Sequence, residues 1–197
     1  NPATTGQDAW CSWNTDFMPS CNWPPGNKQD FPVVCIDWCD AFAYCKSQGR
    51  RLCGKIGGGT NAYGDYANPT RSQWYNACSA GGKYNYPYGG IPNGVYPITV
   101  IDGYVYEACN GCNTDFDGMI AVAQLPGCQS ASPEYAGTYD VSGNASEWED
   151  SCTGTGGVAD MCRRRGGSYF NAAQYGRCGD DWMKAYRDSR NAEIGFR

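Results

Sequence analysis

The chain has 197 residues, of which 13 are cysteine and none is histidine, and its formal net charge is -5 at pH 7. This length corresponds to about one domain. The lack of histidine excludes a His-based catalytic triad and a histidine-ligated iron or zinc site, and the acidic balance argues against a nucleic-acid-binding protein.

The high cysteine content indicates disulfide bonds formed in an oxidising compartment. Only Cys109 and Cys112 have CxxC spacing, so a zinc cluster is not expected. Spacing alone gives no pairing, and an odd number leaves a thiol that is free, or bonded to another chain or to a missing segment. The sequence has no run of about 18 apolar residues, so a membrane span is not predicted. We therefore expect a secreted, extracellular or cell-surface protein whose start at Asn1 follows removal of a targeting segment.

Residues 1–31 are rich in Pro, Asn and Trp without periodicity, which predicts an irregular segment. A helix is predicted next, because apolar residues at 38, 41, 42 and 45 follow helical spacing. Asp37 is suited to cap its start, and Gly49 to end it.

A second helix is predicted from Thr70-x-x-Gln73, read as a capping box, followed by apolar residues at 74, 77 and 78 and an end near Gly81. From residue 84 onward, Gly, Pro and Asn recur every few residues, which indicates short strands and turns. The fold class is therefore α+β, with two helices, a small sheet and mostly loop.

Five sequence blocks resemble the formylglycine-generating enzyme (sulfatase-modifying factor) family. The run PVVCIDWCDAFAYC starts at residue 32, GTYDVSGNASEW at 137, RGGSY at 165 and GFR at 195, and the TRSQW run at 70 precedes YPYG at 86. The resemblance covers residues 32–197 and implies the sulfatase-modifying-factor variant of the C-type-lectin-like fold. The strand block that opens family domains has no counterpart in residues 1–31.

The resemblance also places the family's catalytic cysteines, which hold copper between two thiolates and oxidise a substrate cysteine with oxygen. In this chain the first position is Asn171 and the second falls near Gly176, with Cys178 the nearest thiol. Soft thiolate pairs are what select Cu(I), so copper is not expected. Cys178 is a weak catalytic candidate that we interpret instead as a disulfide partner.

The resemblance implies a calcium site in the turn that begins at residue 140. Its ligands would be the side chains of Asp140 and Glu147 and the main-chain carbonyls of Gly143 and Ala145, which are the hard oxygen donors that Ca²⁺ prefers. The alternative is a plain turn with solvated carboxylates. A weaker second calcium site maps onto the following residues: Asn110, Gly111, Asp115 and Asp117.

These observations predict a non-catalytic, secreted binding or structural domain stabilised by calcium and disulfides, and an extracellular assembly is one setting for it. Expected partners are a protein or glycan on a cell surface, or other copies of the chain. Two alternatives stay open: a copper-dependent oxidase with a rearranged cysteine site, and a carbohydrate-binding, lectin-like module. The second would use an aromatic platform in the loops that contain Tyr63, Tyr66, Tyr84, Tyr86, Tyr88 and Tyr96.

Overall fold

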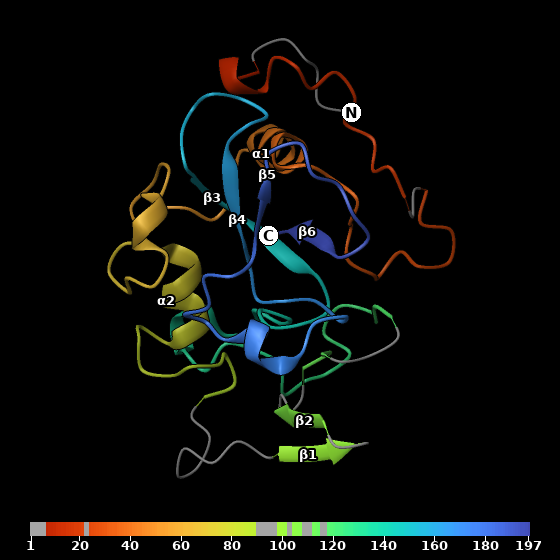
Figure 1. Ribbon diagram of the computed structural model, residues 1–197, viewed down its shortest axis with the longest axis vertical. Coiled ribbons are helices and arrows are strands. Elements are labelled where there is room, and N and C mark those ends of the chain that lie inside the picture. Colours follow the sequence, from red (N-terminus) through yellow and green to blue (C-terminus); the bar gives the residue numbers. More distant parts are fainter. Residues whose placement is uncertain (1–6, 22–23, 90–97, 102–103, 108–111, 115–117) are drawn as a thin grey trace.

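A computed structural model describes residues 7–21, 24–89, 98–101, 104–107, 112–114 and 118–197 (Figure 1). The helices are α1 (Trp38–Ser47) and α2 (Gln73–Ser79), with short 3-10 turns at Ala9–Cys11, Tyr63–Asp65, Pro133–Tyr135 and Ala173–Gly176. The strands are β1 (Ile98–Ile101), β2 (Tyr104–Glu107), β3 (Ser146–Cys152), β4 (Met161–Arg165), β5 (Lys184–Tyr186) and β6 (Ile194–Phe196). The predicted α+β class with two helices, a small sheet and much loop is confirmed.

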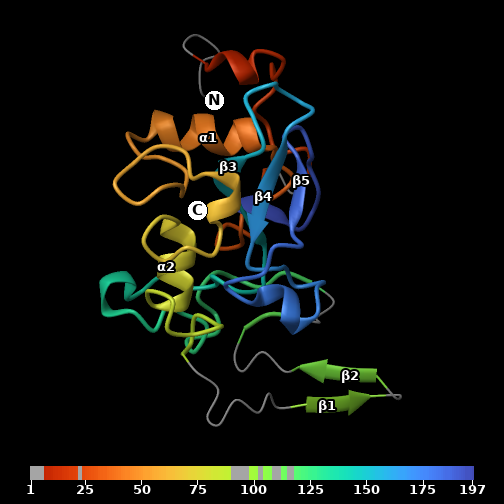
Figure 2. The ribbon, with the colours of Figure 1, turned by 60° about the vertical axis from the view of Figure 1, so that its left-hand side comes forward.

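The main sheet has four strands in the order β5-β4-β3-β6. Strand β4 pairs antiparallel with β3 and β5, whereas β6 pairs parallel with β3, so that Glu147 lies opposite Gly195. The β1–β2 ribbon forms a separate two-stranded sheet at the end of the molecule opposite α1, and both ribbon views agree on this (Figures 1 and 2). The parallel pairing brings the last described residues beside the turn that the sequence singles out.

Helix α1 forms where the sequence predicts it. The Asp37 carboxylate accepts a hydrogen bond from the Asp40 main chain, and the Asp40 side chain accepts one from the Asp37 main chain, which completes a capping box. The apolar face of α1 joins a core that includes Trp38 and Trp148. Each of these indoles donates a hydrogen bond across that core, to the carbonyls of Glu149 and Ile36 respectively, so α1 and β3 are joined by polar contacts as well as packing.

The second helix starts later than the sequence predicts. Its N-cap is Ser72, whose hydroxyl accepts a hydrogen bond from the Tyr75 main chain. The capping box expected from Thr70 is therefore wrong: the Thr70 hydroxyl and N–H both bond to the Asn68 side chain in the preceding turn. The helix ends with Ala80 in the left-handed region, just before the glycine expected to stop it.

Disulfides tie loops to both helices, join β3 to β4 and connect loops to one another. The five pairs in the described residues are Cys11–Cys39, Cys21–Cys35, Cys78–Cys178, Cys112–Cys128 and Cys152–Cys162. This confirms the predicted disulfide framework. Two described cysteines, Cys45 and Cys53, keep free thiols, and burial raises the pKa of Cys45 to about 11 and that of Cys53 to about 12. Both thiols are therefore protonated at neutral pH.

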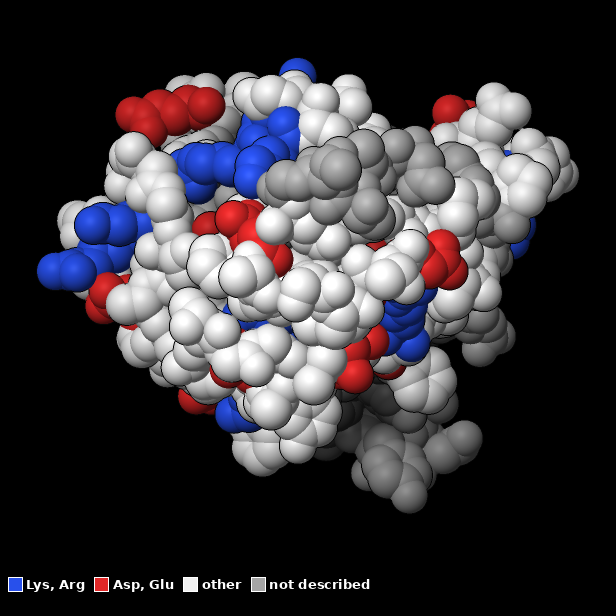
Figure 3. Space-filling model, turned by 90° about the horizontal axis from the view of Figure 1, so that it is seen from above, with Lys and Arg blue, Asp and Glu red and all other residues white. Residues whose placement is uncertain are grey.

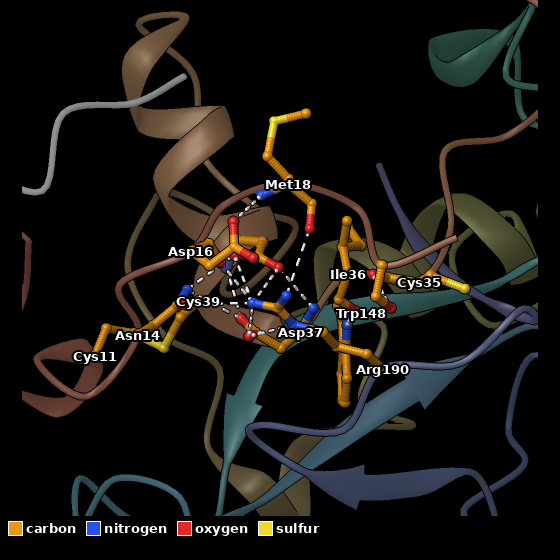
Figure 4. A network of polar contacts seen from close by, with 12 residues as sticks. Cys11, Asn14, Asp16, Met18, Cys35, Ile36, Asp37, Cys39, Trp148 and Arg190 are labelled. Carbon is orange, nitrogen blue, oxygen red and sulfur yellow. Dashed lines mark hydrogen bonds and ion pairs between the residues drawn. A yellow bond between two sulfur atoms is a disulfide. The ribbon is translucent and has the colours of Figure 1, made fainter. Parts of the chain in front are cut away.

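The N-terminal segment is fastened to α1 by a buried polar network (Figure 4). The Arg190 guanidinium forms an ion pair with Asp37 at 2.8 Å and with Asp40 at 3.1 Å, and it also donates to the Asp16 carbonyl. Asn14 donates to the Asp40 carboxylate at 2.8 Å. Two buried carboxylates thus share one arginine, and burial, together with the charge of Asp37, raises the pKa of Asp40 to about 6.

In the described part of the chain, neither helix has the length and apolar character needed to cross a bilayer. On the face shown in Figure 3, basic and acidic side chains lie interspersed rather than gathered by sign. That face does not carry the single basic patch that is typical of nucleic-acid-binding surfaces.

Candidate functional site

The candidate site is built on the tight turn that leads into β3. Three of its residues have left-handed backbone conformations: Asp140 (φ 55°), Gly143 (φ 74°) and Asn144 (φ 62°). A side chain at Gly143 would place its Cβ 2.4 Å from the Asn113 carbonyl oxygen, so only glycine fits there. The turn is therefore wound tightly against the segment that contains Asn113.

Asn144 holds this turn in place through its side chain. Its amide oxygen accepts hydrogen bonds from the Asn113 side chain and the Ile120 main chain, and its NH₂ group donates to the Ile120 carbonyl. The Asp140 main chain donates to the Cys128 carbonyl, and Cys128 is bonded to Cys112. One disulfide therefore braces both segments against which the turn packs.

Three of the four predicted ligand residues of the first calcium site line one cavity of about 310 Å³: Asp140, Ala145 and Glu147. The remaining lining combines apolar side chains with two polar ones: Phe31, Pro32, Val33, Val122, Asn144, Phe196 and Arg197. Gly143 is in the same turn but does not line the cavity. The structure thus brings both predicted carboxylates to one place.

Asp140 is buried and only half satisfied. The residue is 6% exposed. Its Oδ2 accepts a hydrogen bond from the Ala123 main chain at 2.9 Å, whereas Oδ1 is buried without a hydrogen-bond partner. Burial raises the pKa of this carboxyl, and the Ala123 hydrogen bond, the Arg197 charge and the nearby Asn144 side chain oppose the rise. A buried carboxylate oxygen without a partner is costly, and a cation would remove that cost.

Glu147, at 5% exposure, has both carboxylate oxygens engaged. Oε2 accepts a hydrogen bond from the Trp74 indole at 2.8 Å, and Oε1 accepts from Nε of Arg197 at 2.9 Å. Neither partner was anticipated from the sequence. Each belongs to a block of the family resemblance, but only the packing of α2 and β6 against β3 places both side chains on this carboxylate.

The second predicted calcium site, at Asn110, Gly111, Asp115 and Asp117, lies outside the described residues. Across the parts of the chain that are described, no three His, Cys, Asp or Glu side chains gather in a way that could hold a metal ion. A cation at the first site would therefore rely on two carboxylates supplemented by main-chain carbonyls, which is a donor set suited to Ca²⁺ rather than to softer metals.

The loop after RGGSY has no thiol available in it. The Asn171 side chain accepts hydrogen bonds from both the N–H and the hydroxyl of Ser168, which closes a short turn. The Gly176 carbonyl accepts a 2.6 Å hydrogen bond from the Ser142 hydroxyl. Cys178 is fully buried and bonded to Cys78, which is the disulfide role favoured for it over a catalytic one.

Two of the tyrosines considered for a sugar-binding platform are already occupied. The Arg163 guanidinium lies 4.2 Å from the centre of the Tyr63 ring and 4.0 Å from that of Tyr66. Tyr86 is 1% exposed and stacks on Tyr88, and Tyr96 lies outside the described residues. These rings contribute to internal packing.

The two helices, the curled four-stranded sheet and the disulfide-braced loops define the sulfatase-modifying-factor variant of the C-type-lectin-like fold. A family model, the sulfatase-modifying factor enzyme 1-like domain, matches residues 4–197, and the chain belongs to this family. The match begins before residue 32, and the division into an irregular segment (1–31) and a domain (32–197) stays a prediction.

Two curated relatives are distant from this chain in sequence. The formylglycine-generating enzyme of Bos taurus is 26% identical over 196 residues, covering 87% of this chain and 44% of the relative, and that of Streptomyces coelicolor is 26% identical over 208 residues, covering 88% and 56%. The chain thus spans about half the length of these curated relatives.

Solved structures show the same fold. PvdO from Pseudomonas aeruginosa has a TM-score of 0.56 and 19% identity, with 85% of this chain and 60% of that chain covered. Treponema denticola variable protein 1 has a TM-score of 0.51 and 16% identity, with 96% and 79% covered. At these identities the likeness concerns the fold alone.

Proposed function

We propose that this chain is a non-catalytic member of its family: a secreted binding or structural domain held together by disulfides and calcium. The observation that carries the proposal is the composition of the loop after RGGSY. By the family resemblance, Asn171 and Gly176 stand where a pair of catalytic cysteines is expected, and the nearby Cys178 is bonded to Cys78.

Copper chemistry of the family type requires two thiolates that can approach one Cu(I) ion. Asn171 instead uses its amide oxygen to close a turn with Ser168, and glycine at 176 supplies no donor side chain. The described free thiols, Cys45 and Cys53, lie outside this loop, and their raised pKa values keep them protonated. The rearranged-oxidase alternative therefore has no pair of free thiols within this loop.

Calcium is proposed at the turn before β3. The side chains of Asp140 and Glu147 and the carbonyls of Gly143 and Ala145 would hold it, and the partnerless Oδ1 of Asp140 supports a cation there. A bound Ca²⁺ would supply charge neutralisation and bridge the two ends of the turn. Its role would be to fix the loops on which a partner docks.

The extracellular setting rests on the five disulfides, which are typical of oxidising compartments. A cell-surface protein, a glycan or another copy of the chain stays the expected class of partner. The occupied tyrosine rings weigh against the aromatic-platform form of the lectin alternative.

The test is direct. The protein is loaded with Cu(I) and incubated with oxygen and a cysteine-containing peptide, next to a formylglycine-generating enzyme as positive control. We expect no oxygen uptake and no mass change of the peptide cysteine. Turnover by the wild-type chain would refute the non-catalytic assignment. If that turnover is lost when Cys45 and Cys53 are replaced by serine, these thiols form an unforeseen catalytic site; if it survives, the site lies elsewhere.

A further inference from the structure

The Glu147 carboxylate, a proposed calcium ligand, already forms an ion pair with a positively charged side chain of the protein, Arg197. Arg197 contacts the same oxygen twice: Nη2 lies 2.8 Å from Oε1 and Nε donates to it at 2.9 Å. Nη2 also donates to the carbonyl of Tyr139, the residue before Asp140. One guanidinium therefore reaches from Glu147 to the chain beside Asp140, across the two ends of the proposed site.

The Glu147 and Asp140 carboxylates differ in how fully they are hydrogen-bonded. Glu147 is held by a charged group and by the Trp74 indole, whereas Asp140 receives one main-chain hydrogen bond and keeps Oδ1 without a partner. Among the described residues that line the cavity, Arg197 is the one cationic side chain. A single positive charge thus serves a site that contains two carboxylates.

We propose that Arg197 is an internal counter-cation that competes with calcium for the Glu147 carboxylate and so sets the affinity of the site. This inference rests on the calcium site proposed above and adds its regulation. Calcium binding turns the Arg197 side chain away from Glu147, and in calcium-poor surroundings the guanidinium keeps the turn joined to β3.

The surroundings allow this exchange. The Arg197 side chain is 33% exposed, against 7% for Glu147, so the arginine is the more solvent-accessible member of this ion pair. The Trp74 hydrogen bond to Oε2 does not involve Arg197, and it fixes the carboxylate during the exchange. The arginine stem can remain packed in the cavity while its charged head moves out.

The experiment measures calcium affinity by isothermal titration calorimetry on the whole chain in its oxidised form. Arg197→Gln removes the charge and keeps most of the volume, and Arg197→Lys keeps the charge as the matched control. Even at the dielectric constant of water, Coulomb repulsion between a unit positive charge and a divalent ion about 6 Å away weakens binding of that ion about tenfold. We expect calcium to bind Arg197→Gln at least about tenfold more tightly than wild type, with Arg197→Lys close to wild type.

The outcomes separate the two proposals. If wild type binds calcium and Arg197→Gln binds it equally or more weakly, competition is refuted and the calcium site stands. If none of the three proteins binds calcium, the calcium site and the competition both fail. Binding by Arg197→Gln alone supports both, with Arg197 as a complete block.

A second measurement covers the case in which Arg197→Gln does not fold. Wild-type protein labelled with ¹⁵N-arginine is observed by NMR, first in chelator and then in saturating calcium. We expect the Arg197 Nε–H to be protected from solvent exchange in chelator and to lose that protection with calcium. Protection that persists in saturating calcium would overturn the proposal.

Discussion

The Cys78–Cys178 disulfide is predicted to be the most stabilising bridge of the described set. It closes a stretch of 100 residues and joins α2 to the loop after RGGSY, where both sulfur-bearing residues are fully buried. The perturbation is the double replacement Cys78→Ala/Cys178→Ala. The matched control is Cys152→Ala/Cys162→Ala, which opens a bridge across only 10 residues.

The magnitudes follow from the entropy that a cross-link removes from the unfolded chain. Closing a loop of 100 residues corresponds to about 4.7 kcal/mol, and closing one of 10 residues to about 2.7 kcal/mol. The bridges Cys112–Cys128 and Cys152–Cys162 lie inside the longer loop and shorten it, which lowers the value for Cys78–Cys178 only to about 4.5 kcal/mol. The expected difference between the two variants is therefore about 2 kcal/mol.

Guanidinium-induced unfolding under non-reducing conditions, followed by intrinsic fluorescence and circular dichroism, measures both losses. The unfolding free energies of the two variants are comparable only if their denaturant slopes (m values) agree, because opening a long loop also expands the unfolded state. Equal losses for the two double variants, or a larger loss for Cys152→Ala/Cys162→Ala, would refute the loop-entropy argument.

Three further predictions concern buried charge and backbone. Glu149→Gln leaves the buried Arg165 without its ion-pair partner and is expected to cost about 3–5 kcal/mol in chemical unfolding; Asp65→Asn, whose arginine partner is exposed, should cost under about 1 kcal/mol. Gly143→Ala should cost about 2–4 kcal/mol, seen as a lower Tm, because its left-handed backbone and a 2.4 Å contact reject a Cβ. Because the folded-state pKa of Asp40 is raised to about 6, protonation of this carboxyl increases the free energy of unfolding as pH falls from 7 toward 4.5. Asp40→Asn should remove about 1–2 kcal/mol of this pH-dependent increase. An Asp40→Asn protein whose stability varies with pH as in wild type would contradict this assignment.

The parts of the fold that are local in sequence were predictable. Helix α1 follows from helical spacing and from Asp37, since both act within a few residues of chain. The start of α2 differs from the sequence prediction because Thr70 and Ser72 are both good N-caps. Which of them caps the helix depends on Asn68, whose side chain accepts a hydrogen bond from the Thr70 hydroxyl, so that Ser72 caps the helix instead. Local propensity alone does not rank two caps two residues apart.

The candidate site depended on contacts between distant segments. The family motif was enough to select Asp140 and Glu147, but the Arg197 partner of Glu147 arises from the parallel pairing of β6 with β3 across about fifty residues. The same holds for the disulfide partner of Cys178, because cysteine spacing carries no information about pairing. The second predicted calcium site, at Asn110, Gly111, Asp115 and Asp117, stays a sequence-based expectation.

The parallel pairing of β6 with β3 has a consequence for biosynthesis. Strand β3 lies between β4, which follows it closely along the chain, and β6, which comes from residues 194–196. During translation the β3–β4 hairpin can form early, but one side of β3 has no partner strand until residue 196 has left the ribosome. Completion of this sheet therefore has to wait for residues 194–196, and until they emerge the nascent chain exposes an open strand edge that a chaperone would need to cover.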